Sequence, residues 1–252
     1  MKNIYLNIYK PNFANLVKAK KIVENNTVIG MPTETVYGLA GNAYSDKSVK
    51  KIFFLKKRPK INPTIIHFKN LDDLKRDVIL NDNFLKLFKA FCPSPLTFIL
   101  KKKGNSKISK VAAAGKSTVA VRVPKHKVAR KLLGILNFPL AAPSANISSK
   151  LSPTSAKDVF DEFGNKIKFI LDGGRCKIGL ESTIIDLTGK PSILRQGSIT
   201  SEDIYKILRK KIIIKKKTKI IKAPGQLKLH YYPGIPVLMN KKYPKKDGAF
   251  IT

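Results

Sequence analysis

The sequence is poor in cysteine, tryptophan and acidic residues, and it lacks long apolar runs. Its two cysteines, Cys92 and Cys176, form no C-x-x-C pair, and the three histidines are widely spaced, so neither a disulfide framework nor a zinc cluster is expected. The apolar runs are far shorter than the roughly 20 residues of a membrane-spanning helix, and no signal-type stretch opens the chain. We therefore expect a soluble cytoplasmic protein without a membrane partner.

Acidic residues number 16 against 50 lysines and arginines, which gives a formal net charge of +34. Such a surplus is typical of proteins that bind nucleic acid or another polyanion. A lysine-rich codon bias acting at tolerant surface positions predicts the same surplus, and both interpretations stay open. The seven arginines are more informative than the 43 lysines, because only a guanidinium offers a planar fork for carboxylate or phosphate. Arg58, Arg122, Arg175 and Arg195 lie in segments with motif-like features.

Helix and strand patterns alternate from the start of the chain to about residue 210, which predicts an α/β fold. Thr33 or Glu34 is a candidate cap for a short helix that ends at Gly38 or Gly41. The other predicted helices cover residues 13–25, 46–57, 70–91 (as one or two), 126–136, 155–163 and 201–209. The predicted strands cover residues 27–30, 64–68, 95–100, 117–124, 138–143, 167–171, 182–187 and 192–195.

The composition changes after about residue 210, where the chain becomes basic and rich in proline and tyrosine without helical periodicity. We therefore predict a folded domain over residues 1–210 and a basic linker or arm over residues 211–252.

One phosphate-binding pattern can be set aside. The stretch "AGKST" resembles the end of a P-loop, but Lys110 stands where the full pattern needs glycine, and a strand pattern follows where the P-loop needs a helix.

Two polar loops follow predicted strands. "PSANISSKLSPT", residues 143–154, has hydroxyls that could hold phosphate oxygens, or it could be an ordinary turn that caps the next helix. "LDGGRCKIGLESTIID", residues 171–186, has a Gly-Gly turn that allows close approach of a ligand, or simply a tight connection. Arg195, at a strand end, is more often a surface residue than a ligand clamp.

"KKRPKINPTIIHF", residues 56–68, joins four positive charges to an apolar strand pattern that contains His67. From the residues alone, the charges are more typical of a solvated surface, and His67 is more typical of a hydrogen-bonded core residue than of a ligand contact.

Taken together and in order, "PTETVYGLAG", "KKRPKINPTIIHF", "STVAVRVP", "PSANISSKLSPT", "LDGGRCKIGLESTIID" and "ILRQG" resemble the YrdC-type threonylcarbamoyl-AMP synthases over residues 10 to 210. "APGQLKLHYYPGIPV" resembles the linker of the longer, two-domain members, and we expect their C-terminal domain to be largely missing here. The chain departs from the family pattern at Lys57 and Ser149, where glycine is usual, and at Thr64, where leucine is common.

The resemblance implies a strongly twisted mixed β-sheet flanked by helices around a basic cavity. It also implies a nucleotidyltransferase. L-threonine and bicarbonate or CO2 form a carbamate, which attacks the α-phosphate of ATP to give threonylcarbamoyl-AMP and pyrophosphate. The product serves tRNA threonylcarbamoyladenosine modification next to the anticodon.

The resemblance also assigns the site. Lys56 and Arg58 would hold the triphosphate in the catalytic step, while Lys57 and Lys60 would be surface residues. Threonine would contact Thr35, His67, Arg122, Ala142 and Ser182, with Arg122 as a bidentate partner of the carboxylate. ATP would contact Arg58, Asn62, Thr118, Ser144, Ser152 and Arg195, with Tyr231 of the arm as a lid.

The reaction that the resemblance implies leads us to expect Mg²⁺ on the ATP phosphates, but no cluster of Asp and Glu suggests a metal site made of protein ligands alone. The implied partner is the tRNA threonylcarbamoyl-transferase complex that receives the product. A rival hypothesis is an RNA-binding protein without catalysis that uses the basic surface on tRNA or double-stranded RNA. The sequence has none of the common RNA-binding motifs, which argues against it.

Overall fold

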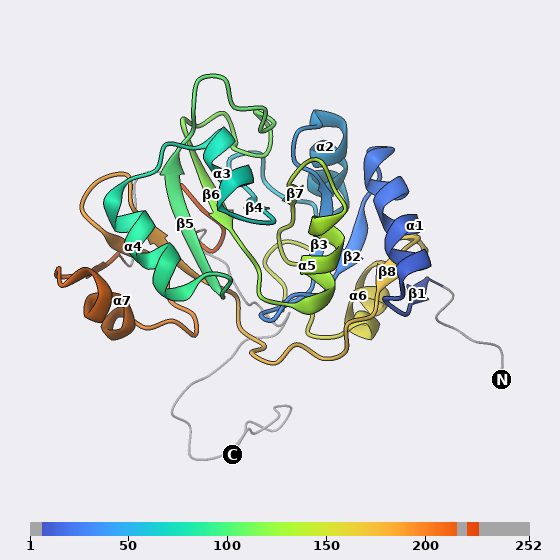
Figure 1. Cartoon of the computed structure of the whole chain (residues 1–252). Coiled ribbons are helices and arrows are strands. Elements are labelled where there is room, and N and C mark those ends of the chain that lie inside the picture. Colours follow the sequence, from blue (N-terminus) through green and yellow to red (C-terminus); the bar gives the residue numbers. More distant parts are fainter. Residues whose placement is uncertain (1–6, 216–220, 227–252) are drawn as a thin grey trace, which may run out of the picture.

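The computed structural model describes residues 7–215 and 221–226. It contains a mixed, eleven-stranded sheet with the strand order β1-β8-β2-β3-β7-β4-β6-β5-β9-β10-β11, and helices cover both sides of it (Figure 1). The α/β class and the twisted mixed sheet predicted from the sequence are therefore confirmed.

The strands are short, and most pair with partners that are distant in sequence. They are β1 (Ile8–Tyr9), β2 (Ile29–Met31), β3 (Gly38–Asn42), β4 (Ile65–His67), β5 (Leu96–Lys101), β6 (Thr118–Arg122), β7 (Leu140–Ala141), β8 (Ile170–Leu171), β9 (Thr183–Asp186), β10 (Ser192–Arg195) and β11 (Ile213–Ile214). The helices are α1 (Phe13–Glu24), α2 (Asp46–Leu55), α3 (Leu71–Asp77), α4 (Asp82–Phe91), α5 (Lys127–Gly134), α6 (Ala156–Phe163) and α7 (Ser201–Leu208), with a 3₁₀ turn at Gly164–Lys166.

The helices begin where the sequence provides a side-chain cap. Ser155 and Thr200 each accept a hydrogen bond from the backbone of the third helical residue, which returns the bond through Asp158 and Asp203. Such capping boxes satisfy N–H groups that have no partner inside the helix. They explain why α6 and α7 begin close to the predicted positions.

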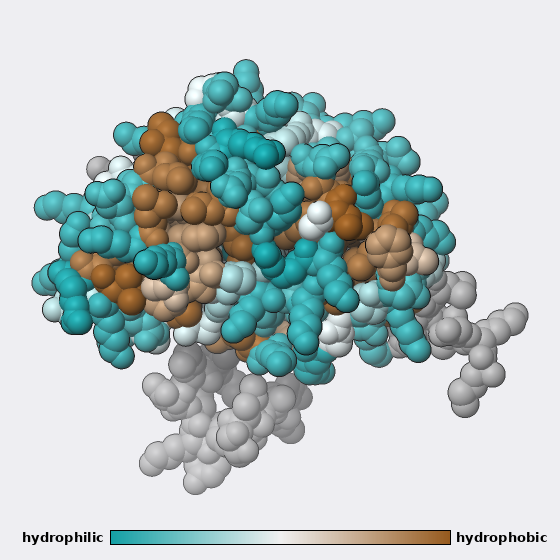
Figure 2. Space-filling model, in the orientation of Figure 1, coloured by the Kyte–Doolittle hydropathy of each residue, from teal (hydrophilic) through white to brown (hydrophobic). Residues whose placement is uncertain are grey.

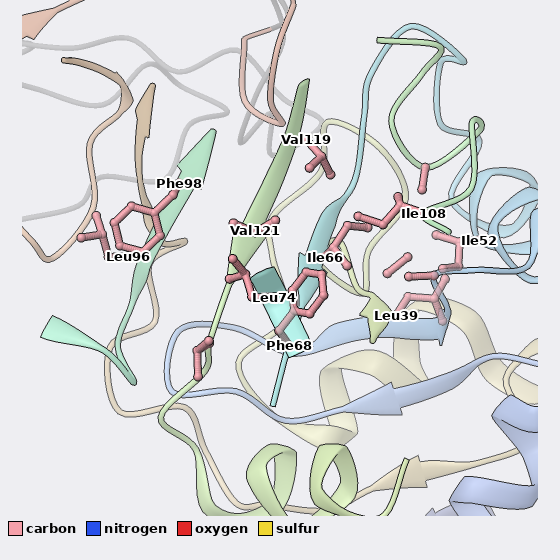
Figure 3. Packing of buried hydrophobic residues seen from close by; sticks show 14 of the residues in the cluster. Leu39, Ile52, Ile66, Phe68, Leu74, Leu96, Phe98, Ile108, Val119 and Val121 are labelled. Carbon is pink, nitrogen blue, oxygen red and sulfur yellow. The ribbon is translucent and has the colours of Figure 1, made fainter. Parts of the chain in front are cut away.

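One face of the sheet carries the larger hydrophobic core. Side chains from α2, α3, α4, α6 and α7 pack there against alternate strand residues, including Ile66, Phe68 and Val121 (Figure 3). On the opposite face α1 and α5 cover only the part of the sheet near β2, β3 and β7. The rest of that face holds a small apolar cluster made of Ile65, Ile99, Ala120, Ile184, Leu194 and Ala223.

The predicted short helix between residues 33 and 41 is wrong. Residues 38 to 42 form β3, a central strand that pairs with β2 and β7. The physical reason is tertiary packing, since a Cβ added at Gly41 would collide with the Ser48 hydroxyl on α2. A small residue is needed where this strand meets that helix, although "GLAGN" has little intrinsic preference for a strand.

Parts of the predicted arm pack onto the sheet. Strand β11 extends the sheet by pairing in parallel with β10. Ala223 is fully buried in the small apolar cluster, and Lys222 Nζ contacts Asp186 Oδ2 at 2.7 Å. Among the described residues no helix is long and apolar enough to span a membrane.

Candidate functional site

A pocket with about 730 Å³ of non-protein space, including its open mouth, lies beside the small apolar cluster, on the part of that sheet face that α1 and α5 leave uncovered. Most of the predicted site residues line it: Thr35, Lys56, Arg58, Asn62, His67, Arg122, Ala142, Ser144, Ser152, Ser182 and Arg195.

Strand alternation explains how two of these residues meet. His67 on β4 and Arg122 on β6 are direct partners in the parallel register, so their side chains leave the same face of the sheet. Ile65, two residues before His67, also lines the pocket. The intervening Ile66 points into the large core instead.

The basic stretch divides as the sequence analysis expected. Lys56 is 1% exposed, whereas Lys57 and Lys60 are exposed. Lys56 Nζ lies 2.5 Å from the backbone oxygens of Ser144 and Asn146 and 3.3 Å from Asn146 Oδ1. Burial lowers the pKa of Lys56, and the neighbouring Arg58 lowers it further. Lys56 thus holds the serine loop in place in addition to lining the pocket.

Arg58 is fixed from its own loop. It donates to the backbone and side-chain oxygens of Asn62, both at 2.8 Å, and to the Pro63 carbonyl at 2.6 Å. Burial lowers the pKa of Arg58 to about 10, so the guanidinium is still charged at neutral pH. This leaves a rigid cation at the pocket wall, suited to an anionic ligand.

A second cation is held by a carboxylate that sequence reasoning missed. Arg195 contacts Glu181 Oε2 at 2.5 Å and also donates to the carbonyl and the hydroxyl of Ser182, both at 3.0 Å. Glu181 Oε1 accepts a bond from Ser152 at 3.1 Å, which joins the two polar loops. In the stretch "GLEST", Glu181 directly precedes Ser182, which was predicted as a site residue. This adjacency is the sequence signal that could have identified Glu181.

The Arg122 fork, predicted to be a carboxylate clamp, is already engaged inside the protein. Its terminal nitrogens contact Glu34 Oε1 at 2.7 Å and Thr35 Oγ1 at 2.9 Å, and Nε donates to the Ser94 carbonyl. Burial is the largest single effect on Glu34 and raises its pKa, but the charge of Arg122, the hydrogen bond from Arg122 and backbone hydrogen bonds together exceed it, so the pKa is lowered. The guanidinium has five N–H groups. Those of the two terminal nitrogens that do not bond to Glu34 or Thr35 are the ones available to a ligand.

His67 is 2% exposed, and neither ring nitrogen has a hydrogen-bond partner among the described residues. Burial lowers the pKa of His67 to about 3, and the Arg122 charge adds to this effect. The imidazole is therefore neutral at physiological pH and offers one donor and one acceptor. Buried polar atoms normally have hydrogen-bond partners, so a ligand in the pocket would supply the partners that the ring nitrogens of His67 lack among the described residues.

Two predicted site residues are not part of this set. Thr118 lies at the start of β6, four residues before Arg122 and hence about 13 Å along the strand from it, outside the pocket lining. Tyr231 lies outside the described residues. The arm nevertheless contributes Pro224 and Gly225 to the pocket wall. The ATP contacts of Thr118 and Tyr231 stay predictions.

Ser149 has a backbone φ of +77° in the serine loop, and Lys57 has a φ of +48°. Both are positions where the resembled family usually has glycine. We expect Ser149→Gly to raise the free energy of unfolding by about 0.5–1 kcal/mol, because relief of left-handed strain exceeds the added entropy of glycine in the unfolded chain. Urea denaturation measures this change.

Ser148→Gly is the matched control for that prediction. Ser148 is the preceding residue in the same loop, and its φ is not positive. It should lose about 0.5–1 kcal/mol, because glycine adds chain entropy there without relieving strain. Equal effects of the two substitutions would contradict the assignment of strain to Ser149.

Surface hydrophilicity does not identify the site. Figure 2 shows hydrophilic residues over much of the visible face, interrupted by hydrophobic areas. The pocket differs because its cations (Lys56, Arg58, Arg122 and Arg195) converge on one concavity and are held by named partners. Among the described residues, no group of three or more His, Cys, Asp or Glu side chains could hold a metal ion.

The sequence is similar to known proteins along most of its length. A model of the Sua5, YciO and YrdC family, described as "Telomere recombination", matches residues 21–197. The chain is 42% identical over 229 residues to the threonylcarbamoyl-AMP synthase of Pyrococcus abyssi, covering 88% of this chain and 66% of the relative. It is 37% identical over 266 residues to the enzyme of that name from Schizosaccharomyces pombe, covering 92% and 65%. The chain thus spans slightly less than two thirds of these two relatives.

The folds were compared as well. The crystal structure of Pyrococcus abyssi Sua5 complexed with L-threonine superposes with a TM-score of 0.84 at 40% identity, covering 89% of this chain and 68% of that one.

Proposed function

Because this chain belongs to the Sua5, YciO and YrdC family, we propose that it is a threonylcarbamoyl-AMP synthase, a nucleotidyltransferase that uses L-threonine, bicarbonate or CO2, and ATP. Relatives that carry this name match along most of the chain. The resemblance found in the sequence motifs leads to the same activity.

The observation that carries the proposal is the composition of the pocket. Cations suited to a triphosphate, Arg58 and Arg195, share one concavity with a neutral histidine and with hydroxyls suited to a small polar substrate. A nucleotide and an amino acid need these two kinds of surface next to each other, so that the carbamate can reach the α-phosphate. A site built only for RNA backbone would have no use for a buried, neutral imidazole.

The proposed chemistry has two steps. The uncharged amine of threonine adds to the carbon of CO2, and the carbamate forms with loss of a proton. A carbamate oxygen then attacks the α-phosphorus of ATP, and the bond to the β-phosphate breaks as pyrophosphate leaves with the electron pair. Arg58 and Arg195 would neutralise the phosphate oxygens, while Lys56 would keep the serine loop against the nucleotide.

The residues present fit a magnesium ion that enters with the nucleotide. The two acidic side chains nearest the site, Glu34 and Glu181, are each paired with an arginine. Neither supplies a ready cage, so the triphosphate oxygens would be the main ligands. The ion would reduce the negative charge of the phosphates. The product would pass to the complex that transfers the threonylcarbamoyl group to tRNA.

The direct test is pyrophosphate release from ATP and Mg²⁺, with threonine and bicarbonate each present or omitted. We expect release only when both are present. Arg58→Gln should lower the rate by at least about 100-fold, since one preorganised charged donor contributes that much at a phosphoryl site. Arg76→Gln, at an arginine that is 70% exposed and pairs with its helix neighbour Asp73, should be unchanged.

Two outcomes would contradict the proposal. One is the absence of release under every condition from protein with a normal circular dichroism spectrum. The other is release that needs neither threonine nor bicarbonate, which would indicate a different nucleotide reaction.

A further inference from the structure

We propose that Thr33 is a positioning residue that makes the Thr35 hydroxyl an acceptor toward the pocket, so that this corner of the site selects a ligand carrying a hydroxyl group. The inference rests on the proposed function for the identity of that ligand, L-threonine. It does not depend on catalysis, because it concerns only which group is bound. Thr33 is 2% exposed and Thr35 is 1% exposed.

The direction of the hydrogen bonds follows from the contacts of Thr33. Its hydroxyl oxygen lies 2.6 Å from the Val36 carbonyl, which can only accept, so the single proton of Thr33 is used there. The backbone N–H groups of Thr35 and Val36 donate to the same oxygen at 3.2 and 3.3 Å. The hydroxyls of Thr33 and Thr35 are 2.9 Å apart. Since the Thr33 proton is used on Val36, Thr35 is the donor in this contact, and the Thr33 oxygen accepts it on a lone pair shared with the two longer N–H contacts.

This fixes what Thr35 can offer. Its proton points to Thr33, and one of its lone pairs accepts from Arg122 Nη1 at 2.9 Å. Arg122 is in turn held by Glu34, so this donor cannot easily turn away. The remaining lone pair of Thr35 is its one unused hydrogen-bonding position among the described contacts, and Thr35 lines the pocket. The pocket therefore meets Thr35 as an acceptor.

The neighbours of Thr35 show which ligand group fits. A carboxylate has no proton to donate, and it gains nothing from an acceptor. An ammonium can donate to Thr35 but cannot accept from the unused Arg122 N–H or from the ring of His67. A hydroxyl can donate to Thr35 and accept from one of these groups at the same time. A site built around such a bond rejects an analogue that lacks the hydroxyl.

The test compares the dissociation constants of L-threonine and L-2-aminobutyrate, which lacks only the hydroxyl, by calorimetry on the full chain. We expect the wild-type protein to prefer threonine by at least about tenfold. Thr33→Val keeps the shape of the side chain but frees the Thr35 proton, and the preference should fall to about threefold or less. Thr33→Ser restores the hydroxyl and should restore the preference.

Thr64→Val is the matched control, because Thr64 is also fully buried and donates to a backbone carbonyl, but lies outside the pocket lining. It should lose stability like Thr33→Val and keep the wild-type preference. An unchanged preference in Thr33→Val would overturn the proposal, and so would a wild-type protein that does not discriminate, even if Thr33→Val failed to fold. If both ligands bind but no pyrophosphate is released, the proposed function is refuted. The ratio of the two dissociation constants still tests the inference about Thr33 in that case.

Discussion

Lys56→Met should lower the free energy of unfolding by about 2–4 kcal/mol and reduce pyrophosphate release by at least about 100-fold. The reason is that Lys56 Nζ satisfies two buried backbone oxygens and the Asn146 side chain. Methionine fills the space but donates nothing, which leaves these acceptors without a partner. The serine loop that carries Ser144 would then keep only its backbone bond, from Ser148 N–H to the Lys56 carbonyl, to the loop after α2.

The matched control is Lys57→Met, one residue further along the chain. Lys57 is exposed, so its substitution should change stability by no more than about 0.5 kcal/mol. Urea denaturation of both variants, with pyrophosphate release measured in parallel, separates the buried ammonium from the general loss of a positive charge. Similar stabilities for the two variants would show that Lys56 does not hold the loop.

Acidification from pH 7 to pH 5 should destabilise the wild-type protein by about 2 kcal/mol more than His67→Gln. In the folded protein burial lowers the pKa of His67 to about 3, whereas the unfolded chain has the ordinary value near 6.5. Below about pH 6.5 the unfolded state therefore binds a proton that the folded state does not. The stability due to the neutral ring is fully present above that pH and is lost progressively down to about pH 3.

Urea denaturation at both pH values measures this difference, and carboxylates that titrate in the same range affect both proteins alike. His126→Gln serves as the comparison. His126 is only half-buried and its pKa is lowered in the same direction, so its substitution should produce a smaller difference. A pH dependence of His67→Gln identical to that of the wild-type protein would mean that folding does not lower the pKa of His67.

The sequence predicts most helices and strands because their signals are local. Spacing of apolar residues and capping side chains, such as Ser155 before α6, depend on neighbours within a few positions. Strand β3 was missed because the reason for Gly41 is Ser48 on another element, and no local rule contains that contact. Strand β11 was missed for a similar reason, since two exposed isoleucines among lysines become a strand only beside β10.

The candidate site was predicted in part. The family resemblance identified residues that line the pocket, such as His67, but not the charged side chains that pair with them. Glu34 pairs with Arg122 across 88 positions in the sequence, and it had been considered only as a helix cap. The engaged Arg122 fork and the hydrogen-bond direction at Thr35 follow from three-dimensional contacts, which spacing does not encode.

The strand order also bears on how this protein is made. Strand β1 pairs with β8 through Ile8 and Ile170, and the pocket wall extends from Thr33 to Gly225. At roughly 5 to 20 residues per second, a ribosome needs on the order of 10 to 30 s between the two partners of the first pairing. During that interval the N-terminal strand has no edge to join, and the site cannot close until nearly the whole chain has emerged. Until then the incomplete sheet exposes unpaired strand edges, which is the condition that chaperones counter in general.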